Sequence, residues 1–158
     1  MYRFEDKPNP QHKVKIGDTA PDFVINYYTG QKVKLSDLRG KVVMLQVTAS
    51  WCSVCLKEMP HIEAEIWQKM KDNPDFVLIA IDLKESPDKI PPFIKVAKTT
   101  YPIALDTNGA IFELYAEKDS GVTRNIIIDK SGKIAFLTRL FDRDEYDAMK
   151  KKIEELLK

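Results

Sequence analysis

The residues with the clearest chemical potential are Cys52 and Cys55, the only two cysteines of the chain, in the stretch VTASWCSVCLKEMPH. Two thiols at this spacing can belong to a metal site, a structural disulfide or a redox centre. Two cysteines are too few for a scaffold built on several disulfides. A four-ligand zinc site would need both histidines, His12 and His61, to converge without a second paired-ligand motif. The spacing therefore favours a redox centre and predicts no metal.

The elements expected around the two cysteines separate their roles. The apolar run VVMLQVTA predicts a buried strand, and apolar residues recur every three or four positions from Ser53 to about Lys71, which is typical of a helix packed on a core. Cys52 falls where the strand gives way to the helix, and the free N–H groups there favour a thiolate. Cys55 lies one turn further on and begins the apolar stripe. We expect Cys52 to attack a substrate disulfide and Cys55 to resolve the mixed disulfide; the alternative is two buried cysteines that only pack.

The rest of the chain predicts an α/β fold. Two short strands around Thr29-Gly30 predict a hairpin, and DFVLIAID predicts a second buried strand that completes a right-handed βαβ unit. Helices are expected in SPDKIPPFIKVAKTT and TNGAIFELYAE, then a hairpin of TRNIIID and KIAFLTRL, then a last helix that opens at Asp142. This order resembles the thioredoxin-like fold: a central mixed β-sheet flanked by helices, with an added N-terminal β-hairpin and a central helical insertion. We expect residues 1–13 to form a flexible arm and residues 14–158 the domain.

The composition narrows the choice of partners. The 158 residues include 25 basic and 24 acidic ones, so no excess charge favours nucleic acid. The longest apolar runs, VVML and FVLIAI, are far shorter than the roughly 20 residues that cross a bilayer. The first residues also lack the apolar core of a signal peptide. We expect a monomeric globular protein.

A family resemblance sharpens the prediction. The stretch SWCSVCLKEMP resembles the Trp-Cys-x-x-Cys centre of thioredoxins, including Pro60 five residues after the second cysteine. The chain is similar to the TlpA/ResA-like branch, because residues 17–45 resemble the N-terminal hairpin and entry strand of that branch and GVTRNIIIDKSGKI resembles its closing hairpin. The resemblance covers roughly residues 14–157. It implies a thiol-disulfide oxidoreductase that reduces protein disulfides in the bacterial periplasm or envelope, takes electrons from a membrane-bound thiol reductant and needs no cofactor beyond its own Cys52–Cys55 disulfide.

Glu58 is the expected proton partner of the thiols. It follows Cys55 by three residues and so lies near the same face of the helix, and the resemblance implies that this glutamate is an active-site acid. Thioredoxins carry a buried aspartate six residues before the first cysteine, where this chain has Gln46. Glu58 is therefore the candidate for proton exchange with Cys55, and a solvated helix glutamate is the alternative.

Thr123 stands where the family carries a cis-proline beside the cysteines. A non-proline cis bond costs about 3 kcal/mol, so we expect a trans bond and a loop that still faces the disulfide. Arg124 is expected to be a solvated charge, with an acidic substrate group as the alternative partner. Substrate contacts are predicted at five residues: Trp51, Ser53, Val54, Val122 and Thr123.

Two other classes of protein remain open. A peroxiredoxin-like peroxidase shares the APDF opening, but its reactive cysteine belongs in a Thr-x-x-Cys setting after a proline. Thr48-Ala-Ser-Trp-Cys misses that spacing by one residue and lacks the proline. A non-catalytic thiol-binding or metal-binding module is the second alternative.

Overall fold

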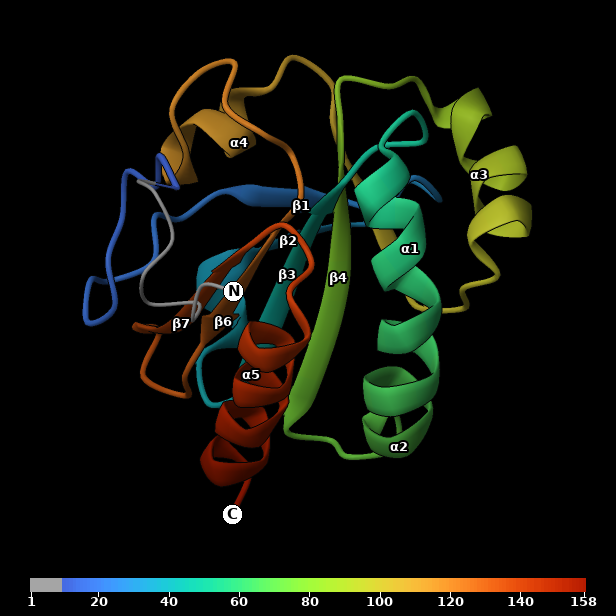
Figure 1. The fold of residues 1–158 in the computed structure, drawn as a ribbon. Coiled ribbons are helices and arrows are strands. Elements are labelled where there is room, and N and C mark those ends of the chain that lie inside the picture. Colours follow the sequence, from blue (N-terminus) through green and yellow to red (C-terminus); the bar gives the residue numbers. More distant parts are fainter. Residues whose placement is uncertain (1–9) are drawn as a thin grey trace.

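A five-stranded mixed sheet forms the centre of the computed structural model, which describes residues 10–158 (Figure 1). Its central strand β3 pairs in parallel with β4 and antiparallel with β6, β4 pairs in parallel with β5, and β6 pairs antiparallel with β7. In spatial order the strands are β5 (Ile103–Asp106), β4 (Phe76–Leu83), β3 (Val42–Thr48), β6 (Arg124–Ile128) and β7 (Ile134–Arg139). The mixed sheet and the parallel βαβ unit predicted from the sequence are confirmed.

Helices and a small hairpin cover the two faces of this sheet. On one face, α1 (Ser53–Ile62), α3 (Ile90–Ala97) and α5 (Arg143–Leu156) pack on Met44, Leu78 and their neighbours. On the other face, α4 (Ala110–Tyr115), the short helix η2 (Leu35–Leu38) and the hairpin of β1 (Val24–Asn26) and β2 (Lys32–Lys34) pack on Val43, Ile79 and their neighbours. Because both faces are covered, β3 has no exposed residue, which explains its continuous apolar sequence.

One long helical segment follows β3. It consists of α1, the π-helical turn η3 (Glu63–Trp67) and α2 (Gln68–Met70). Cys55, Met59, Ile62 and Ile66 are each fully buried along it, as their spacing predicts. Pro60 lies inside α1 and has no N–H to donate, and the π-helical turn begins three residues later. The sequence periodicity predicts this helix but not its π-helical turn.

The strand β5 is absent from the sequence prediction, which expects only helices between β4 and β6. The chain instead forms the short helix η4 (Pro87–Lys89), then α3, then β5 at the edge of the sheet, then α4. Four residues, Ile103–Asp106, are too few to show a period against the flanking helical patterns, so β5 was missed. Among the described residues, no helix is both long enough and apolar enough to span a membrane.

The N-terminal segment lies against both edges of the sheet. Tyr27 forms an isolated bridge with Ala104 in β5, and Thr19 forms one with Lys133 beside β7. Residues 10–13 are also tied to the domain: Lys13 N donates to Tyr115 O at 2.9 Å, and Gln11 O accepts from Glu117 N at 2.9 Å. Residues 10–13 thus contact the domain, and the flexibility expected of the arm stays a prediction. The remainder of that predicted arm lies outside the described residues.

Helix α5 begins at Asp142, as the sequence predicts. Asp142 is the N-cap, and its side chain accepts from Asp144 N at 3.1 Å. The Glu145 carboxylate accepts from Arg139 N at 3.0 Å, at the end of β7. Glu145 therefore joins the helix to the sheet.

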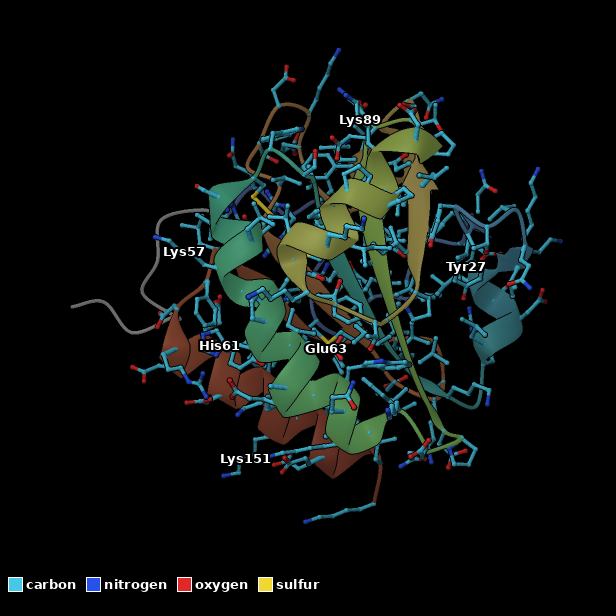
Figure 2. All side chains as sticks on the ribbon, turned by 90° about the vertical axis from the view of Figure 1, so that its right-hand side faces the viewer. Tyr27, Lys57, His61, Glu63, Lys89 and Lys151 are labelled. Carbon is cyan, nitrogen blue, oxygen red and sulfur yellow. A yellow bond between two sulfur atoms is a disulfide. The ribbon has the colours of Figure 1, made fainter. Side chains whose placement is uncertain are left out.

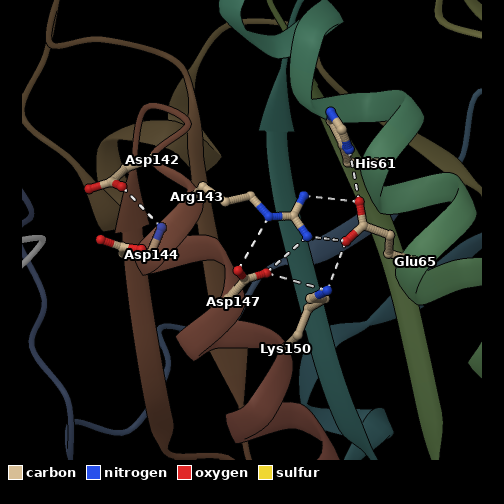
Figure 3. Close-up of polar contacts among 7 residues, drawn as sticks. All are labelled: His61, Glu65, Asp142, Arg143, Asp144, Asp147 and Lys150. Atoms are coloured by element: carbon tan, nitrogen blue, oxygen red, sulfur yellow. Dashed lines mark hydrogen bonds and ion pairs between the residues drawn. The ribbon is translucent and has the colours of Figure 1, made fainter.

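An ion-pair network joins the π-helical turn to α5 (Figure 3). The Glu65 carboxylate accepts from Arg143 Nη2 at 2.6 Å, from Lys150 Nζ at 2.7 Å and from His61 Nδ1 at 2.8 Å. Asp147 binds the same two α5 cations, Arg143 at 3.0 Å and Lys150 at 3.4 Å. The hydrogen bond from Arg143, opposed by partial burial and supported by Lys150 and His61, holds the pKa of Glu65 well below its usual value.

We expect Glu65→Gln to lower the free energy of unfolding at pH 7 by about 1 kcal/mol, because three charged or ionisable partners, Arg143, Lys150 and His61, share this carboxylate. A depressed pKa stabilises the fold above the unfolded-state value of 4.5 and loses that contribution as pH falls below it. Urea unfolding should therefore show a difference between wild type and variant that shrinks from pH 6 to pH 3. Glu154→Gln, at an exposed position of α5, is the control; an equal effect of both variants would contradict the network's contribution.

Candidate active site

The two cysteines form a disulfide at the start of α1, with their Cα atoms 5.3 Å apart. Cys52 is the N-cap of the helix, and its sulfur accepts from Cys55 N at 3.2 Å. This contact places Cys52 Sγ at the positive end of the helix, where a thiolate is stabilised. Cys52 is 7% exposed, whereas Cys55 is fully buried. The difference in exposure follows the order expected for an attacking and a resolving cysteine.

Thr123 lies directly against the disulfide. Its Oγ1 is 3.1 Å from Cys52 Sγ and 3.3 Å from Cys55 Sγ, and the residue is buried. No cis peptide bond occurs among residues 10–158, so the expectation of a trans bond before Thr123 is confirmed. The loop therefore faces the disulfide without the proline that the family carries there, and it presents a hydroxyl group instead.

Arg124, the next residue, is fully buried, so the expectation of a solvated charge is wrong. Its guanidinium donates to Gly121 O at 3.0 Å and to Pro10 O at 2.9 Å, and it lies over the Phe112 ring. Burial, and then the charge of Arg139, lower the pKa of Arg124 to about 10. Arg124 thus remains charged at neutral pH inside the protein.

Glu58 is 1% exposed, which rules out a solvated helix glutamate. Its Oε2 accepts from Asn125 Nδ2 at 3.0 Å, and Asn125 also donates to Thr138 Oγ1 at 3.1 Å. The i,i+3 spacing on α1 keeps Glu58 beside Cys55. Burial, and then the Glu58 carboxylate, raise the pKa of Tyr101 well above its usual value.

Gln46 lies on β3 opposite Asn125 in the ladder, beneath α1. Its Oε1 accepts from Tyr101 Oη at 2.7 Å, and the side chain is fully buried. An amide cannot exchange a proton as the aspartate of thioredoxins can. Gln46 therefore cannot accept the Cys55 proton, and Glu58 stays the candidate for that exchange.

A pair of carboxyl groups, Asp82 and Glu85, lies at the carboxyl end of β4. Asp82 is fully buried opposite Thr48 of β3, and burial, followed by the nearby Glu85, raises the pKa of Asp82 to about 8. The Glu85 carboxylate accepts from Ser50 N at 2.7 Å and from Ser50 Oγ. Burial opposes ionisation of Glu85, but Asp82 and these hydrogen bonds outweigh it and lower its pKa. Glu85 thereby holds the turn that precedes Trp51 and Cys52.

The predicted substrate contacts divide by exposure. Trp51 is 66% exposed, and Ser53 is also exposed at the start of α1. Val54 is partly buried, whereas Val122 and Thr123 are buried. Lys57 is exposed on the outer side of α1, away from the disulfide (Figure 2).

Two hollows flank the Ser50-Trp51 turn. One, of about 330 Å³, is lined by Trp51, Leu83, Phe112 and charged residues that include Lys84 and Lys118. The other, of about 280 Å³, lies against α3 and is lined by Ser50, Lys89, Pro92, Phe93 and Val96. Both hollows open beside the residues that precede Cys52.

Sequence reasoning missed several residues of this site. Asn125 interrupts the apolar run TRNIIID, and Asp82 ends the apolar run FVLIAI, so each is a polar residue where a buried strand is predicted. That signal could have identified both. Arg139 and Glu85 carry no comparable signal, because a charged residue beside a turn is ordinary. Within residues 10–158, no cluster of three His, Cys, Asp or Glu side chains is placed to bind a metal.

Known proteins with similar sequence and structure agree with this geometry. The AhpC/TSA family model matches residues 16–137. Thiol-disulfide oxidoreductase ResA of Bacillus thuringiensis subsp. konkukian is 32% identical over 148 residues, which cover 94% of this chain and 80% of that protein. ResA of Bacillus subtilis is 29% identical over 78% of this chain and 67% of its own. A Bacteroides thetaiotaomicron protein, provisionally described as a protein disulfide isomerase, is 51% identical over 95% of this chain and 94% of its own, with a TM-score of 0.90.

We expect Glu58→Gln to shift the pH dependence of thiol alkylation to lower pH, because removing a negative charge beside Cys55 lowers the thiol pKa. The glutamine can still accept from Asn125, so the fold should survive. The measurement is the rate of iodoacetamide modification from pH 5 to pH 10. Glu63→Gln is the matched control, since that carboxylate binds Thr100 instead. An identical shift in both variants, or none in Glu58→Gln, would contradict the role of Glu58.

Proposed function

Because this chain belongs to the AhpC/TSA family and carries the redox-active Cys52–Cys55 pair of a thiol-disulfide oxidoreductase, we propose that it reduces disulfides in extracytoplasmic protein substrates. The activity itself, dithiol-disulfide exchange, follows from the relatives and from the disulfide geometry. The direction of electron flow, the compartment and the division of roles are our proposal. The observation that carries it is the Cys52 sulfur at the first turn of α1, with Cys55 buried behind it.

In the reaction that we propose, the Cys52 thiolate attacks a substrate disulfide and releases one substrate thiolate. A mixed disulfide then joins Cys52 to the substrate. Cys55 loses its proton and attacks Cys52 Sγ, which releases the second substrate thiolate and forms the Cys52–Cys55 disulfide. Glu58, buried one turn from Cys55, is the acceptor that we propose for the Cys55 proton.

The electron donor that we propose is a membrane-bound thiol protein, and the working form is a monomer. The support is the resemblance to the ResA proteins, which are similar over most of the chain. The donor must re-reduce the Cys52–Cys55 disulfide by the same exchange chemistry. It therefore approaches the same exposed end of the disulfide as the substrate does.

The surface beside Cys52 suits an extended polypeptide. Trp51 offers a largely exposed ring next to the sulfur, and a hollow lies on each side of the Ser50-Trp51 turn. Val54 of α1 and the 122–123 loop complete the contacts that we propose, and the burial of Val122 and Thr123 restricts contact there to close approach. A substrate cysteine in a flexible or unfolded segment would fit this arrangement best.

The peroxidase and the non-catalytic module are not supported as alternatives. The relatives are named for thiol-disulfide exchange, and their similarity extends over most of the chain. We therefore propose neither.

We expect the Cys52–Cys55 couple to have a reduction potential nearer the roughly −270 mV of thioredoxin than the roughly −120 mV of a strong oxidase. Ser53 and Val54 add no positive charge between the cysteines, and the buried Glu58 disfavours a thiolate. Equilibration of the protein in glutathione buffers measures the value. A potential above about −180 mV would contradict a reductase and favour an oxidase or isomerase.

A substrate trap tests the function directly. Cys55→Ser should arrest the mixed disulfide on Cys52, because the second attack cannot occur. Mass spectrometry of proteins captured from an envelope fraction identifies the substrates, and Cys52→Ser is the matched control that should capture none. Equal capture by the two variants would reverse or remove the roles assigned to the cysteines.

A further inference from the structure

A single hydroxyl group contacts both sulfurs of the disulfide. Thr123 Oγ1 is within 3.1 Å of Cys52 Sγ and 3.3 Å of Cys55 Sγ, and Thr123 is only 3% exposed. A hydroxyl has one proton to donate and two lone pairs to accept. It can therefore donate to one sulfur while it accepts from the thiol of the other. A proline at this position could do neither.

Two arginines hold the loop that carries this hydroxyl. Arg124 binds two consecutive residues of the preceding turn, through Nε to Gly121 O at 3.0 Å and through Nη2 to Ser120 Oγ at 2.9 Å. Arg139 Nη1 donates to Thr123 O at 3.4 Å. The Arg139 guanidinium also fills the space beside Gly121, where an added Cβ would lie 1.5 Å from Nη2.

The Arg124 guanidinium is itself fixed from the far side. Its Nη1 donates to Pro10 O at 2.9 Å and to His12 Nδ1 at 2.8 Å. Burial, then Arg124 and then Arg139, lower the pKa of His12 to about 4, so the imidazole is neutral at pH 7 and accepts this bond. Residues 10–12 and the 120–124 loop are thus held together through the buried guanidinium of Arg124.

We propose that Thr123 is a catalytic residue whose hydroxyl stabilises the thiolate of the cysteine pair, and that Arg124 and Arg139 are positioning residues that aim it. In the reduced enzyme the Thr123 hydroxyl donates to the Cys52 thiolate and accepts from the Cys55 thiol. When Cys52 enters the mixed disulfide, its charge has passed to the released substrate thiolate. The hydroxyl then turns to Cys55 Sγ and stabilises the thiolate formed when Cys55 gives up its proton.

The same contact serves the reverse half of the cycle. A donor thiolate that attacks Cys52 Sγ breaks the Cys52–Cys55 bond and leaves the electron pair on Cys55 Sγ. Thr123 Oγ1 is already within reach of that sulfur. No oxidant or reductant beyond the substrate and the thiol donor is needed, so the inference rests on the proposed disulfide exchange and adds one group to it.

The charges around the disulfide come from several elements. Glu58 of α1 follows Cys55 by three residues and binds Asn125, and Glu85 after β4 holds the preceding turn. On the other side of the sheet are Arg124 of β6 and Arg139 of β7, with His12 beside Arg124. Beside these groups, Thr123 contributes the hydroxyl that lies within hydrogen-bond distance of both sulfurs.

The first test replaces Thr123 by Val, which keeps the branched shape and removes the hydroxyl, and by Ser, which keeps the hydroxyl. We expect Thr123→Val to slow alkylation of Cys52 about three- to tenfold at pH 6, since loss of a charge-assisted hydrogen bond raises the thiol pKa. The glutathione equilibrium should shift about tenfold toward the disulfide, or about 30 mV more negative. Thr123→Ser should stay within about twofold of wild type in both measurements. If Val does not fold, Thr123→Ala serves as the second variant without a hydroxyl.

The outcomes separate this inference from the proposed function. Wild-type protein that exchanges no disulfides with glutathione would overturn the function. Active Val and Ala variants with the thiol pKa and equilibrium of wild type would overturn the role of the hydroxyl alone. Equal losses in Ser and Val would also overturn it, because packing and not the hydroxyl would then be responsible.

The second test disturbs the two arginines that hold the 120–124 loop and leaves the Thr123 hydroxyl in place. Gly121→Ala should displace the Arg139 guanidinium, and Arg124→Gln should remove one donor set. We expect each to raise the Cys52 thiol pKa in the same direction as Thr123→Val, with little added effect when combined with it. Fully additive effects in the double variants would contradict positioning through Thr123. Thermal unfolding of each variant identifies any general loss of structure.

Discussion

The hydrogen bond from Cys55 N to Cys52 Sγ is the interaction on which the active centre depends. It ties the sulfur to the first turn of α1, where unpaired N–H groups favour negative charge. The sulfur can hold this place because β3 is fixed on both sides, by a parallel ladder with β4 and an antiparallel one with β6. The chain therefore leaves the carboxyl edge of the sheet at a fixed point, and the thiol chemistry follows from this one strand–helix junction.

Polar groups interrupt the apolar face beneath α1 at the end nearest the disulfide. Gln46, Glu58, Asn125 and Tyr101 are all buried there and joined in pairs by hydrogen bonds. A buried polar group without a partner costs about 1–3 kcal/mol, and an apolar residue at each place would pack at no such cost. Their concentration at this end of the sheet is explained by the chemistry of the thiols, since structural needs alone favour an apolar core.

Much of this arrangement can be predicted from the sequence, because the period of the apolar residues and the positions of the turn residues indicate it. The βαβ unit, both hairpins and the burial of Cys55 follow from apolar spacing and from turn residues. The burial of Glu58 and Arg124 does not, since a charged residue is normally exposed and only tertiary contacts reveal the exception. The contact of Thr123 with both sulfurs is also beyond prediction, because it depends on side chains from β7 and from the N-terminal segment that hold the loop.

The N-terminal segment, by bridging to Ala104 in β5 and to Lys133 beside β7, occupies hydrogen-bonding positions at both edges of the sheet. Tyr28 N also donates to Ile103 O, and Gly17 N donates to Ile134 O. Unpaired edge strands are the usual sites at which a peptide or a second chain adds a strand. Strand addition is hindered at these positions, which protects the sheet from edge-to-edge aggregation. Of the positions at which a polypeptide could bind, these edge positions are therefore already occupied, whereas Trp51 beside the disulfide is left largely exposed.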